Sequence, residues 1–535
     1  MKNNKPFFKK KNFNQRKDFP IQAQPFLVKD LSLESVGKTA LLKGIIDGIS
    51  QTEGPTLFYL DDGTGTFTLK GFIGPGKRAY PEIEETNAVK AKVQIKEYNG
   101  TLEGEIIKLE KLEGQDAEFV KKQIEEVQRQ RAKPINTDFL IKSKILEKLK
   151  SHFIKAATEI RLAIIQNRPI IVRHHNDADG YSSGFALERG ILPLIEEQHS
   201  SSKAAWEFFV RSPCAAPFYE IDDSIRDTST SLRNAAKFSN KMPLVIIADN
   251  GSTEQDLFGI QQGRVHGMDF IVVDHHPYEE DVISKEVKAH INPFLIGESG
   301  SEFSAGMLCT ELARFISPVS NISQIPAMAG LADRINNPEA MEQYLKIAEK
   351  EGYSKELSKK IATVIDFVSA KLRFMEAREY IEVLFGEPRG KQKKLVDLMI
   401  PYITDLESKG LEIAKSAART EKIGDKTLQT LMIEETYPGF GFYPKPGKAL
   451  GMLHDWIQTE KKLDKVVSAG IMSSAITFRA TDGADFSVHE FINLIDKKIP
   501  SAFVEGGGHK NAGSITFVPN KRKEILELLR EYLKK

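Results

Sequence analysis

The sequence predicts an α/β protein in which a parallel sheet domain carries the candidate site. A β-barrel is expected before this domain, and a helical insert and a second α/β domain after it. Three apolar runs, at 170–172, 244–248 and 270–273, have the β-branched composition of buried strands, and Asp or His follows each within two residues. Parallel strands bring their carboxyl ends to one edge of a sheet, so these polar side chains are expected to meet there. Short strand patterns separated by tight turns between residues 26 and 112 predict the barrel.

Length and composition set the broad class. At 535 residues the chain is too long for a single core, so several domains are expected. Its 75 basic and 74 acidic residues balance, so net charge indicates no particular partner. The two cysteines, Cys214 and Cys309, form neither a zinc ribbon nor a disulfide framework, which fits a reducing cytoplasm. With no apolar run of membrane-spanning length and no signal-peptide core, we expect a soluble, cytoplasmic protein without membrane association.

The first segment, residues 1–25, is a basic arm. Its seven Lys and Arg residues stand against a single acidic residue, Asp18, and three phenylalanines are interleaved with them. This composition predicts a disordered, solvated tail. The same combination also suits phosphate contact and base stacking, so single-stranded nucleic acid is a candidate partner of the arm.

Residues 26–115 resemble an OB-fold. Strands are expected at 39–49, 57–60, 66–73, 88–98 and 105–109, with hairpin turns at Asp61-Asp62-Gly63 and Asn99-Gly100. Barrels of this type bind single-stranded nucleic acid on one strand face. The candidate contact residues on that face are Phe58, Tyr59, Phe67, Lys70 and Phe72. Strand alternation predicts that roughly half of them belong to the barrel core instead.

The remaining boundaries follow the change of periodicity. Residues 116–166 predict a helical connector, and 167–337 the parallel sheet domain. Residues 338–426 predict a helical insert with its own small core, in which a basic cluster at 389–394 is expected on a loop. Residues 427–535 return to α/β alternation, with strands expected at 430–434, 465–471 and 475–480 and a final helix at 522–532.

The most informative stretch is His174-His175-Asn176-Asp177-Ala178-Asp179-Gly180, directly after the first apolar strand. It brings two carboxylates and one or two imidazoles into six residues. Like charges at this spacing repel, and buried carboxylates are costly unless a cation or a donor meets them, so a metal site removes the difficulty. A polar loop is the alternative for this stretch alone. A helix is expected to follow from about Ser183. Spacing does not decide whether His174 or His175 is the metal ligand.

The two other strands supply further ligand types. One ends at Asp249-Asn250-Gly251 and the other at Asp274-His275-His276. Three strands that each deliver Asp or His at the same end predict a metal centre. Oxygen and imidazole donors without thiolate suit Mn²⁺ or Mg²⁺ better than a structural zinc. Asp333, on a helix after an apolar stretch, would on its own be expected to be a surface carboxylate.

The C-terminal domain contains a glycine run, Gly506-Gly507-Gly508, followed by His509. Glycines leave backbone N–H groups open to an anion, and a histidine donates to phosphate oxygens. A flexible turn is the alternative. Arg479, on a predicted strand of the same domain, is a second candidate for phosphate binding.

These motifs together resemble the DHH-family phosphoesterases. They are HxDADG at 175–180, DNG at 249–251, DHH at 274–276, the Asp of GLAD at 333 and GGGHxxAG at 506–513, in that order. Within the family the chain is most similar to RecJ-like single-strand exonucleases of archaeal type, with a DHH-associated C-terminal domain. The N-terminal barrel and arm lie outside this resemblance. The insert resembles, in position and character, that of GINS-associated nucleases and of their inactive replication-helicase relative.

The resemblance implies a site of two metal ions, usually Mn²⁺. His175 and Asp177 would bind one ion, and Asp179, His275 and Asp333 the other, with Asp249 bridging the two. Asp274 would orient a histidine, and His276 would face the scissile phosphate. Arg479, Gly506, Gly507, Gly508 and His509 would hold the substrate.

The expected function is a two-metal exonuclease that degrades single-stranded DNA or RNA to mononucleotides. One alternative is a nanoRNase-like phosphodiesterase for oligonucleotides or cyclic dinucleotides. A different class is a replication-associated scaffold that binds a GINS-type partner, but that interpretation predicts missing ligands, and every expected ligand is present.

Overall fold

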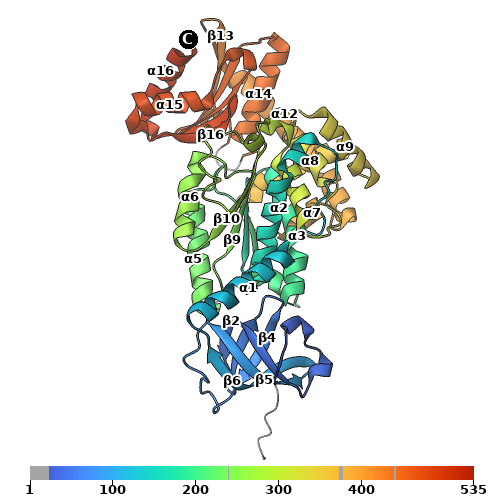
Figure 1. Cartoon of the computed structure of the whole chain (residues 1–535). Coiled ribbons are helices and arrows are strands. Elements are labelled where there is room, and N and C mark those ends of the chain that lie inside the picture. The colour runs from blue at the N-terminus through green and yellow to red at the C-terminus, as the bar shows by residue number, and fades with distance from the viewer. Residues whose placement is uncertain (1–22, 200, 239, 373–377, 439–441, 535) are drawn as a thin grey trace, which may run out of the picture. The chain divides into compact units, whose positions relative to one another are not determined.

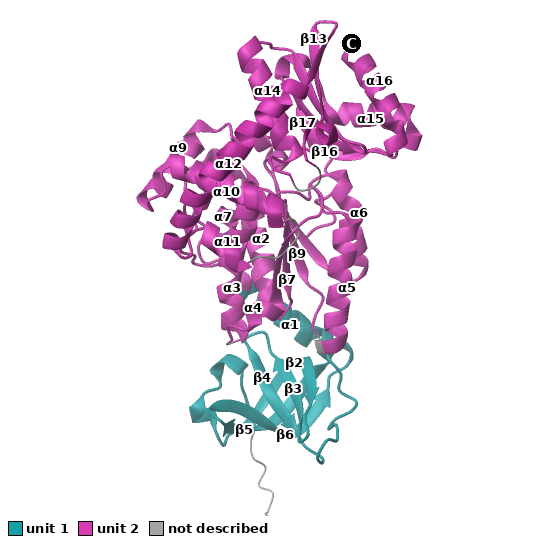
Figure 2. Cartoon of the chain, turned by 180° about the vertical axis from the view of Figure 1, so that it is seen from behind, with its two compact units in different colours: residues 1–131 teal, residues 132–535 magenta. Residues whose placement is uncertain are grey.

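The computed structural model describes residues 23–199, 201–238, 240–372, 378–438 and 442–534 (Figure 1). The chain divides into two compact units, residues 1–131 and 132–535 (Figure 2). The basic arm predicted at 1–25 lies outside the described residues except for its last three. None of the described helices is long and apolar enough to cross a membrane.

Unit 1 contains a closed barrel of the predicted OB-like type. Its strands are β2 (Thr39–Gln51), β3 (Thr56–Asp61), β4 (Thr66–Gly71), β5 (Ala88–Tyr98) and β6 (Thr101–Lys111). Antiparallel pairing joins β2 to β3 and β5, β3 to β4, and β5 to β6, and the parallel pair β4–β6 closes the barrel. Both predicted tight turns form: Gly63, Asn99 and Gly100 have φ of 86°, 52° and 81°. A short strand, β1 (Gln24–Pro25), runs parallel to β2.

Some of the candidate nucleic-acid contacts are buried inside the barrel and others are not. Phe58 and Phe67 point into the barrel core with Leu60 and Leu69, because alternate residues of a strand face the same side. Buried rings offer no face to a base, so these two are core residues and not part of a platform. Tyr59 and Lys70 are half-buried, and Phe72 is exposed.

The predicted helical connector is two helices, α1 (Gly114–Ala132) and α2 (Lys144–Ile165). Val120 and Ile124 of α1 pack with Ala88 of the barrel. Gln128 donates a hydrogen bond to the carboxylate of Asp61 at 2.8 Å, at the turn that ends β3. α1 thereby becomes part of the barrel unit.

Unit 2 is built on a five-stranded sheet in which every pairing is parallel. Its strands are β7 (Ile170–His174), β8 (Phe209–Pro213), β9 (Leu244–Ala248), β10 (Asp269–Val273) and β11 (Ala289–Ile291). The order β11-β10-β9-β7-β8 means that the chain reverses its direction of travel across the sheet between β7 and β9. In open α/β sheets this switch point is where ligands bind, at the carboxyl ends of the strands.

Helices cover both faces of this sheet (Figure 1). On one face, α5 (Ile221–Phe238) and α6 (Glu254–Val265) adjoin the apolar layer that contains Val245, Phe270 and Val272. On the other, α2, α3 (Ala178–His199) and α7 (Ala305–Ile316) cover Ile246 and Ile271. Burial on both sides explains why the strands are continuous apolar runs. The short helices α4 (Ala204–Phe208) and α8 (Ile325–Ala332) complete this part.

The expected helical insert is present, but its separate core is not. It comprises α9 (Pro338–Lys350), α10 (Lys355–Leu372), α11 (Arg378–Leu384) and α12 (Arg389–Ala417). The stripe that contains Ile361, Val364 and Ile365 joins the same apolar cluster as the sheet, because α10 packs against α8. The basic cluster at 389–394 is also not on a loop: it forms the first turns of α12, and the Arg389 guanidinium lies over the Tyr353 ring at 3.6 Å.

The C-terminal part is a six-stranded mixed sheet. Its strands are β12 (Arg419–Ile423), β13 (Lys426–Met432), β14 (Val466–Ile471), β15 (Ala475–Ala480), β16 (Glu505–His509) and β17 (Ala512–Thr516), in the order β12-β13-β14-β15-β17-β16. The helices α15 (Val488–Lys498) and α16 (Arg522–Leu533) pack on one face, and α13 (Ile433–Thr436) and α14 (Pro446–Lys461) belong to a second apolar cluster.

Candidate metal centre

The first set of ligand atoms follows β7. The Nδ1 atom of His175 lies 3.0 Å from the Asp177 carboxylate and 3.6 Å from that of Asp249, which follows β9. β7 and β9 are hydrogen-bonded neighbours, so the two strand ends meet at the switch point of the sheet. Ligand atoms of these three residues all lie within 4.8 Å of one another.

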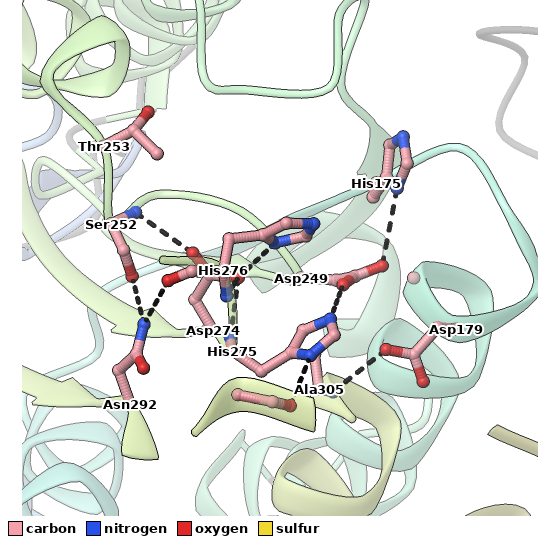
Figure 3. A network of polar contacts seen from close by, with 12 residues as sticks. His175, Asp179, Asp249, Ser252, Thr253, Asp274, His275, His276, Asn292 and Ala305 are labelled. Atoms are coloured by element: carbon pink, nitrogen blue, oxygen red, sulfur yellow. Dashed lines mark hydrogen bonds and ion pairs between the residues drawn. The ribbon is translucent and has the colours of Figure 1, made fainter. Parts of the chain in front are cut away.

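The second set follows β10. The Nε2 atom of His275 lies 3.4 Å from the Asp249 carboxylate (Figure 3). The same atom lies 3.6 Å from the carboxylate of Asp333, the residue after α8. Asp249, His275 and His276 form a second group of ligand atoms within 4.8 Å of one another. Asp249 therefore belongs to both groups. Asp333, which the sequence alone would place on the surface, is brought against His275 by the packing of α8.

Asp249 is held in an unusual backbone conformation, with φ of 62°. This left-handed geometry is costly for a residue other than glycine and tends to persist where function requires it. It is also almost fully buried, and its Oδ2 atom has no hydrogen-bond partner among the described residues. An unsatisfied buried carboxylate oxygen is destabilising unless a cation or donor meets it.

Asp179 lies on a helix that begins within the stretch expected to be a loop. The helix α3 begins at Ala178 and not near Ser183, so Asp179 is in its first turn. Its carboxylate accepts the backbone N–H groups of Ala305 and Gly306 at 2.9 and 3.1 Å, at the start of α7. This contact anchors the motif between the N-terminal ends of two helices, where a negative charge is favoured.

Charge crowding is visible in the pKa values of the acids. Burial, followed by the charges of Asp249 and Asp333, raises the pKa of Asp179 well above its usual range. Burial also raises the pKa of Asp333 to about 6, although His275 opposes the shift. Several carboxylates in one buried site cannot all ionise cheaply without positive charge between them.

The histidines carry the complementary shifts. Burial lowers the pKa of His275, but the charges of Asp333 and Asp249 outweigh it and raise the pKa well above its usual value. Burial likewise lowers the pKa of His175, and Asp177 and Asp249 outweigh it. The Nδ1 atom of His275 faces the carbonyl of Gly300 at 3.0 Å. A donor bond there leaves Nε2, the atom near both carboxylates, as the metal-binding nitrogen.

The choice between the two adjacent histidines is decided by packing. His174 is fully buried, its Nδ1 atom faces the carbonyl of His175 at 2.7 Å, and its ring packs edge-on against Tyr181. Burial and the neighbouring Arg211 lower the pKa of His174 to about 3, so the ring is neutral. The structure therefore places His175, and not His174, with the carboxylates.

These residues fit a divalent cation. The donors are carboxylate oxygens and imidazole nitrogens without thiolate, which suits Mn²⁺ or Mg²⁺. The Asp249 oxygen without a hydrogen-bond partner and the raised pKa values of Asp179 and Asp333 are what a site built around positive charge is expected to show.

Asp274 and His276 form a hydrogen-bonded pair beside these ligands. The Nδ1 atom of His276 lies 2.8 Å from the Asp274 carboxylate, which also accepts the backbone N–H groups of Ser252, His275 and His276 (Figure 3). Burial lowers the pKa of His276, but Asp274 outweighs it and the pKa is raised. Asp274 therefore fixes the orientation of the imidazole and favours its protonated form.

Lys445 is a neighbour of the site that the sequence did not reveal. This residue, at the start of α14, donates hydrogen bonds from Nζ to the carbonyl of Asn176 at 2.8 Å and to the hydroxyl of Ser369 at 2.9 Å. It holds the loop between His175 and Asp177, although the two segments lie far apart in the sequence. Burial raises and His175 lowers the pKa of Asp177, and Lys445 adds to the lowering, so the net shift is downward.

The substrate-binding residues predicted in the C-terminal domain include the glycine run and His509. The glycine run is not a loop: Gly506, Gly507 and Gly508 lie in β16, the edge strand, which pairs with β17. Gln255 of α6 donates a hydrogen bond to the Gly506 carbonyl at 2.9 Å, which connects this edge to the parallel sheet part. The side chain of His509 lies outside the described part of the structure.

Arg479 on β15 is largely buried, and the positive charge of a second arginine acts on it. Burial and the charge of Arg334 lower the pKa of its guanidinium. Arg334 directly follows Asp333, and its guanidinium lies 3.3 Å from the carboxylate of Asp455 on α14, so it connects the candidate site with the C-terminal part. The sequence singled out Arg479 but not Arg334, because only the fold brings the two segments together.

Comparison with known proteins places the chain in a family. The model of the DHH family, N-terminal domain, matches residues 169–334, which contain every one of the ligand candidates described above. The uncharacterized protein MJ1198 of Methanocaldococcus jannaschii is 34% identical over 539 residues, a match that covers 95% of this chain and 70% of that protein. The chain belongs to the DHH family.

Solved structures agree with this assignment. The DHH domain of PF0399, described as a member of the s1p family of ribosomal proteins, superposes with a TM-score of 0.74 and 36% identity, covering 79% of this chain and 99% of that one. The exonuclease RecJ bound to manganese has a TM-score of 0.50 at 16% identity, covering 74% and 96%. RecJ of Thermus thermophilus in complex with Mn²⁺ has a TM-score of 0.50 at 15% identity, covering 77% and 59%. The fold is RecJ-like.

Proposed function

We propose that this protein is a two-metal phosphodiesterase that acts as a RecJ-like exonuclease on single-stranded DNA or RNA and releases mononucleotides. The observation that carries the proposal is the position of Asp249, which lies within ligand distance of His175 and Asp177 on one side and of His275 on the other. A carboxylate shared by two ligand groups is suited to bridge two ions.

The ligand roles are proposed residue by residue. His175 and Asp177 hold one ion, Asp179, His275 and Asp333 hold the other, and Asp249 serves both. Mn²⁺ is the preferred ion and Mg²⁺ the alternative. When bound, the ions supply a hydroxide nucleophile near neutral pH and neutralise charge on the phosphate. A ring nitrogen of His276 also lies near Asp249. Its hydrogen bond to Asp274, however, favours substrate binding over metal binding as the role of His276.

The protein's own groups then bind and orient the phosphodiester. A protonated His276 keeps its Nδ1–H on Asp274 and donates from Nε2 to an oxygen of the scissile phosphate. Arg479 and Arg334 attract the anionic backbone from the C-terminal side, and the backbone of Gly506, Gly507 and Gly508 with His509 lines its path. The OB-like barrel supports a polymeric substrate, because barrels of this type bind single strands.

The decisive experiment uses single-stranded DNA and RNA of equal length, labelled separately at each end, with Mn²⁺ or with chelator. We expect Mn²⁺-dependent shortening, and the label that is lost first gives the polarity. Asp249→Ala is expected to abolish hydrolysis because both ion sites lose a ligand. Hydrolysis at the wild-type rate by this variant would contradict the assignment.

Other outcomes separate the alternatives. Cleavage of dinucleotides or cyclic dinucleotides without shortening of any polymer would indicate the nanoRNase-like branch. In that case removal of residues 1–131, the barrel unit, should leave activity on dinucleotides unchanged. If no substrate is hydrolysed and a replication protein of GINS type co-purifies, the protein would instead be a scaffold.

A further inference from the structure

A cavity of about 200 Å³ lies beside the candidate site in unit 2. Three segments line it: the start of α6, the loop that follows His276, and the first turns of α15. Two of these segments are tied to β16: Gln255 of α6 donates a hydrogen bond to the Gly506 carbonyl, and the Nε2 atom of His489 of α15 lies 2.9 Å from the carbonyl of Gly508. The cavity is therefore walled by elements that hydrogen bonds connect.

The chemistry of the lining disfavours a phosphate and suits a neutral ring. Pro277, Tyr278 and Ile492 supply apolar surface, and Thr253 and Asn493 supply uncharged hydrogen-bonding groups. The remaining lining side chains include three glutamates, whereas none of the described lining residues is a lysine or arginine. An anionic group would be repelled here, but a heterocycle that carries amide-like donors and acceptors would not.

Tyr278 offers a ring in a fixed orientation. It packs edge-on against Phe294, with ring centroids 6.0 Å apart and an interplanar angle of 63°, and its centroid lies 6.2 Å from that of His290. Burial, with the charge of Asp281, raises its pKa to about 12, so the phenol stays neutral. Aromatic side chains held in place in this way are the usual platforms for base stacking.

The cavity begins next to the hydrogen-bonded pair Asp274 and His276. Pro277 and Tyr278 directly follow His276, and Thr253 directly follows Ser252, whose backbone N–H donates to the Asp274 carboxylate. In Figure 3, Thr253 and His175 lie on opposite sides of Asp274 and His276. A nucleotide whose phosphate contacts His276 would thus find the metal ligands on one side and the cavity on the other.

We propose that this cavity is a nucleobase subsite that receives the base of a nucleotide adjoining the scissile phosphate, with the ring stacked on Tyr278 and its edge bonded by Asn493. This inference rests on the proposed nuclease function, and it names the part of the substrate that the site selects. The acidic rim repels phosphate, and the Tyr278 ring and the apolar lining suit a flat base better than a ribose.

The test separates the subsite from hydrolysis. 2-Aminopurine riboside 5′-monophosphate is titrated with the full-length protein, with and without Mn²⁺, because its fluorescence falls when the ring stacks on an aromatic side chain. We expect saturable quenching by the wild type. Loss of one stacking contact is worth about 1–3 kcal/mol, so Tyr278→Ala should weaken binding about 5- to 100-fold. Adenosine should compete for the site, whereas inorganic phosphate should not.

Matched variants show whether a loss of binding comes from the lost ring or from misfolding. Tyr278→Phe keeps the ring and should bind like the wild type, and Tyr278→Leu keeps apolar volume against Phe294 if the alanine variant fails to fold. Phe258→Ala removes an exposed aromatic of α6 that does not line the cavity, and should change nothing. Equal quenching by wild type and Tyr278→Leu, or no saturable quenching by the wild type, would overturn the subsite.

A hydrolysis experiment tests whether the subsite binds a base of the oligonucleotide substrate. With oligonucleotides that carry an abasic unit at the end that is degraded first, the wild type should show a KM raised about 5-fold or more, whereas Tyr278→Leu should not distinguish abasic from normal ends. If no oligonucleotide is hydrolysed, the nuclease proposal fails, and the fluorescence titration alone still decides the fate of the subsite.

Discussion

The Nδ1 atom of His276 lies 2.8 Å from Oδ1 of Asp274, a carboxylate that is fully buried and accepts three backbone N–H groups. The carboxylate is held by backbone N–H groups that follow β9 and β10, so it fixes the ring orientation of His276 and favours its protonated form. Carboxylates that orient histidines in this way commonly affect activity through the partner and not by touching substrate.

We therefore expect Asp274→Asn to lower kcat about 10- to 100-fold while Mn²⁺ affinity changes little, because the neutral amide no longer favours a protonated His276. Steady-state kinetics together with Mn²⁺ titration by electron paramagnetic resonance check this expectation. Asp269→Asn, at the opposite end of the same strand, is the matched control and should retain wild-type kinetics. A parallel loss of metal binding in Asp274→Asn would instead show that Asp274 supports the ligands themselves.

Lys445 is expected to tune metal affinity through the Asn176 carbonyl. Lys445→Met removes the donor that holds the loop between His175 and Asp177 and should weaken Mn²⁺ binding by about 10-fold or more. Lys445→Arg should restore part of the loss. Lys448→Met is the control, since Lys448 pairs with Asp366 and Glu407 and does not contact that loop. Unchanged Mn²⁺ affinity in Lys445→Met would contradict this expectation and would mean that the hydrogen bond of Lys445 does not affect the metal ligands.

Glu311 should make folding stability depend on pH. It is fully buried on α7, accepts hydrogen bonds from the Leu140 backbone at 2.9 Å and the Tyr344 hydroxyl at 2.7 Å, and burial raises its pKa from 4.5 to about 7. Because the folded pKa exceeds the unfolded one, the protonated acid stabilises the fold below about pH 4.5. This contribution, at most about 3 kcal/mol, is lost as pH rises through 7.

Glu311→Gln removes this titration and keeps one acceptor oxygen for the Leu140 N–H group. The difference in Tm between the variant and the wild type should therefore shift in favour of the variant between about pH 5 and pH 8. Thermal unfolding at a series of pH values measures it. A difference that stays constant over this range would mean that Glu311 does not change its protonation state there.

The exposed aromatics of the barrel are expected to bind single strands. Phe72 and Tyr98 are 63% and 61% exposed, and the Lys70 ammonium lies 4.5 Å from the centroid of the Tyr98 ring. Replacing both aromatics by alanine should weaken single-strand affinity about 5-fold or more while dinucleotide hydrolysis is unchanged. Fluorescence anisotropy with a labelled oligonucleotide measures the affinity. Ile107→Ala, an exposed aliphatic residue of β6, is the control; an equal loss in both would argue against stacking.

Much of the fold is predictable because it depends on local patterns. Three of the five strands of the parallel sheet, β7, β9 and β10, and the strands of the barrel are predicted within a few residues of their observed ends, since burial on two faces or on one face leaves different periodicities. The turn residues Asn99 and Gly100 mark their hairpin because both adopt positive φ.

The sequence predictions are wrong where packing between distant segments decides the outcome. The predicted start of α3 is five residues late, because the acidic motif looks like a loop until the contacts of Asp179 with α7 are known. The insert shares the core of the sheet instead of having its own, because its apolar stripe does not reveal that α8 is its partner. The glycine run forms a strand and not a loop, because edge-strand pairing with β17 leaves no signal in three consecutive glycines.

The sequence by itself determined the ligand types, their order along the chain and the strand ends that carry them, since these depend on residue identity and on the short-range periodicity of buried strands. Only the tertiary structure decided that Asp249 is shared between two ligand groups, that His175 and not His174 belongs to the site, and that Lys445 holds its loop. Those facts depend on which side chains are brought within a few ångströms of one another. Strand order and packing set these distances, and neither can be read from local sequence.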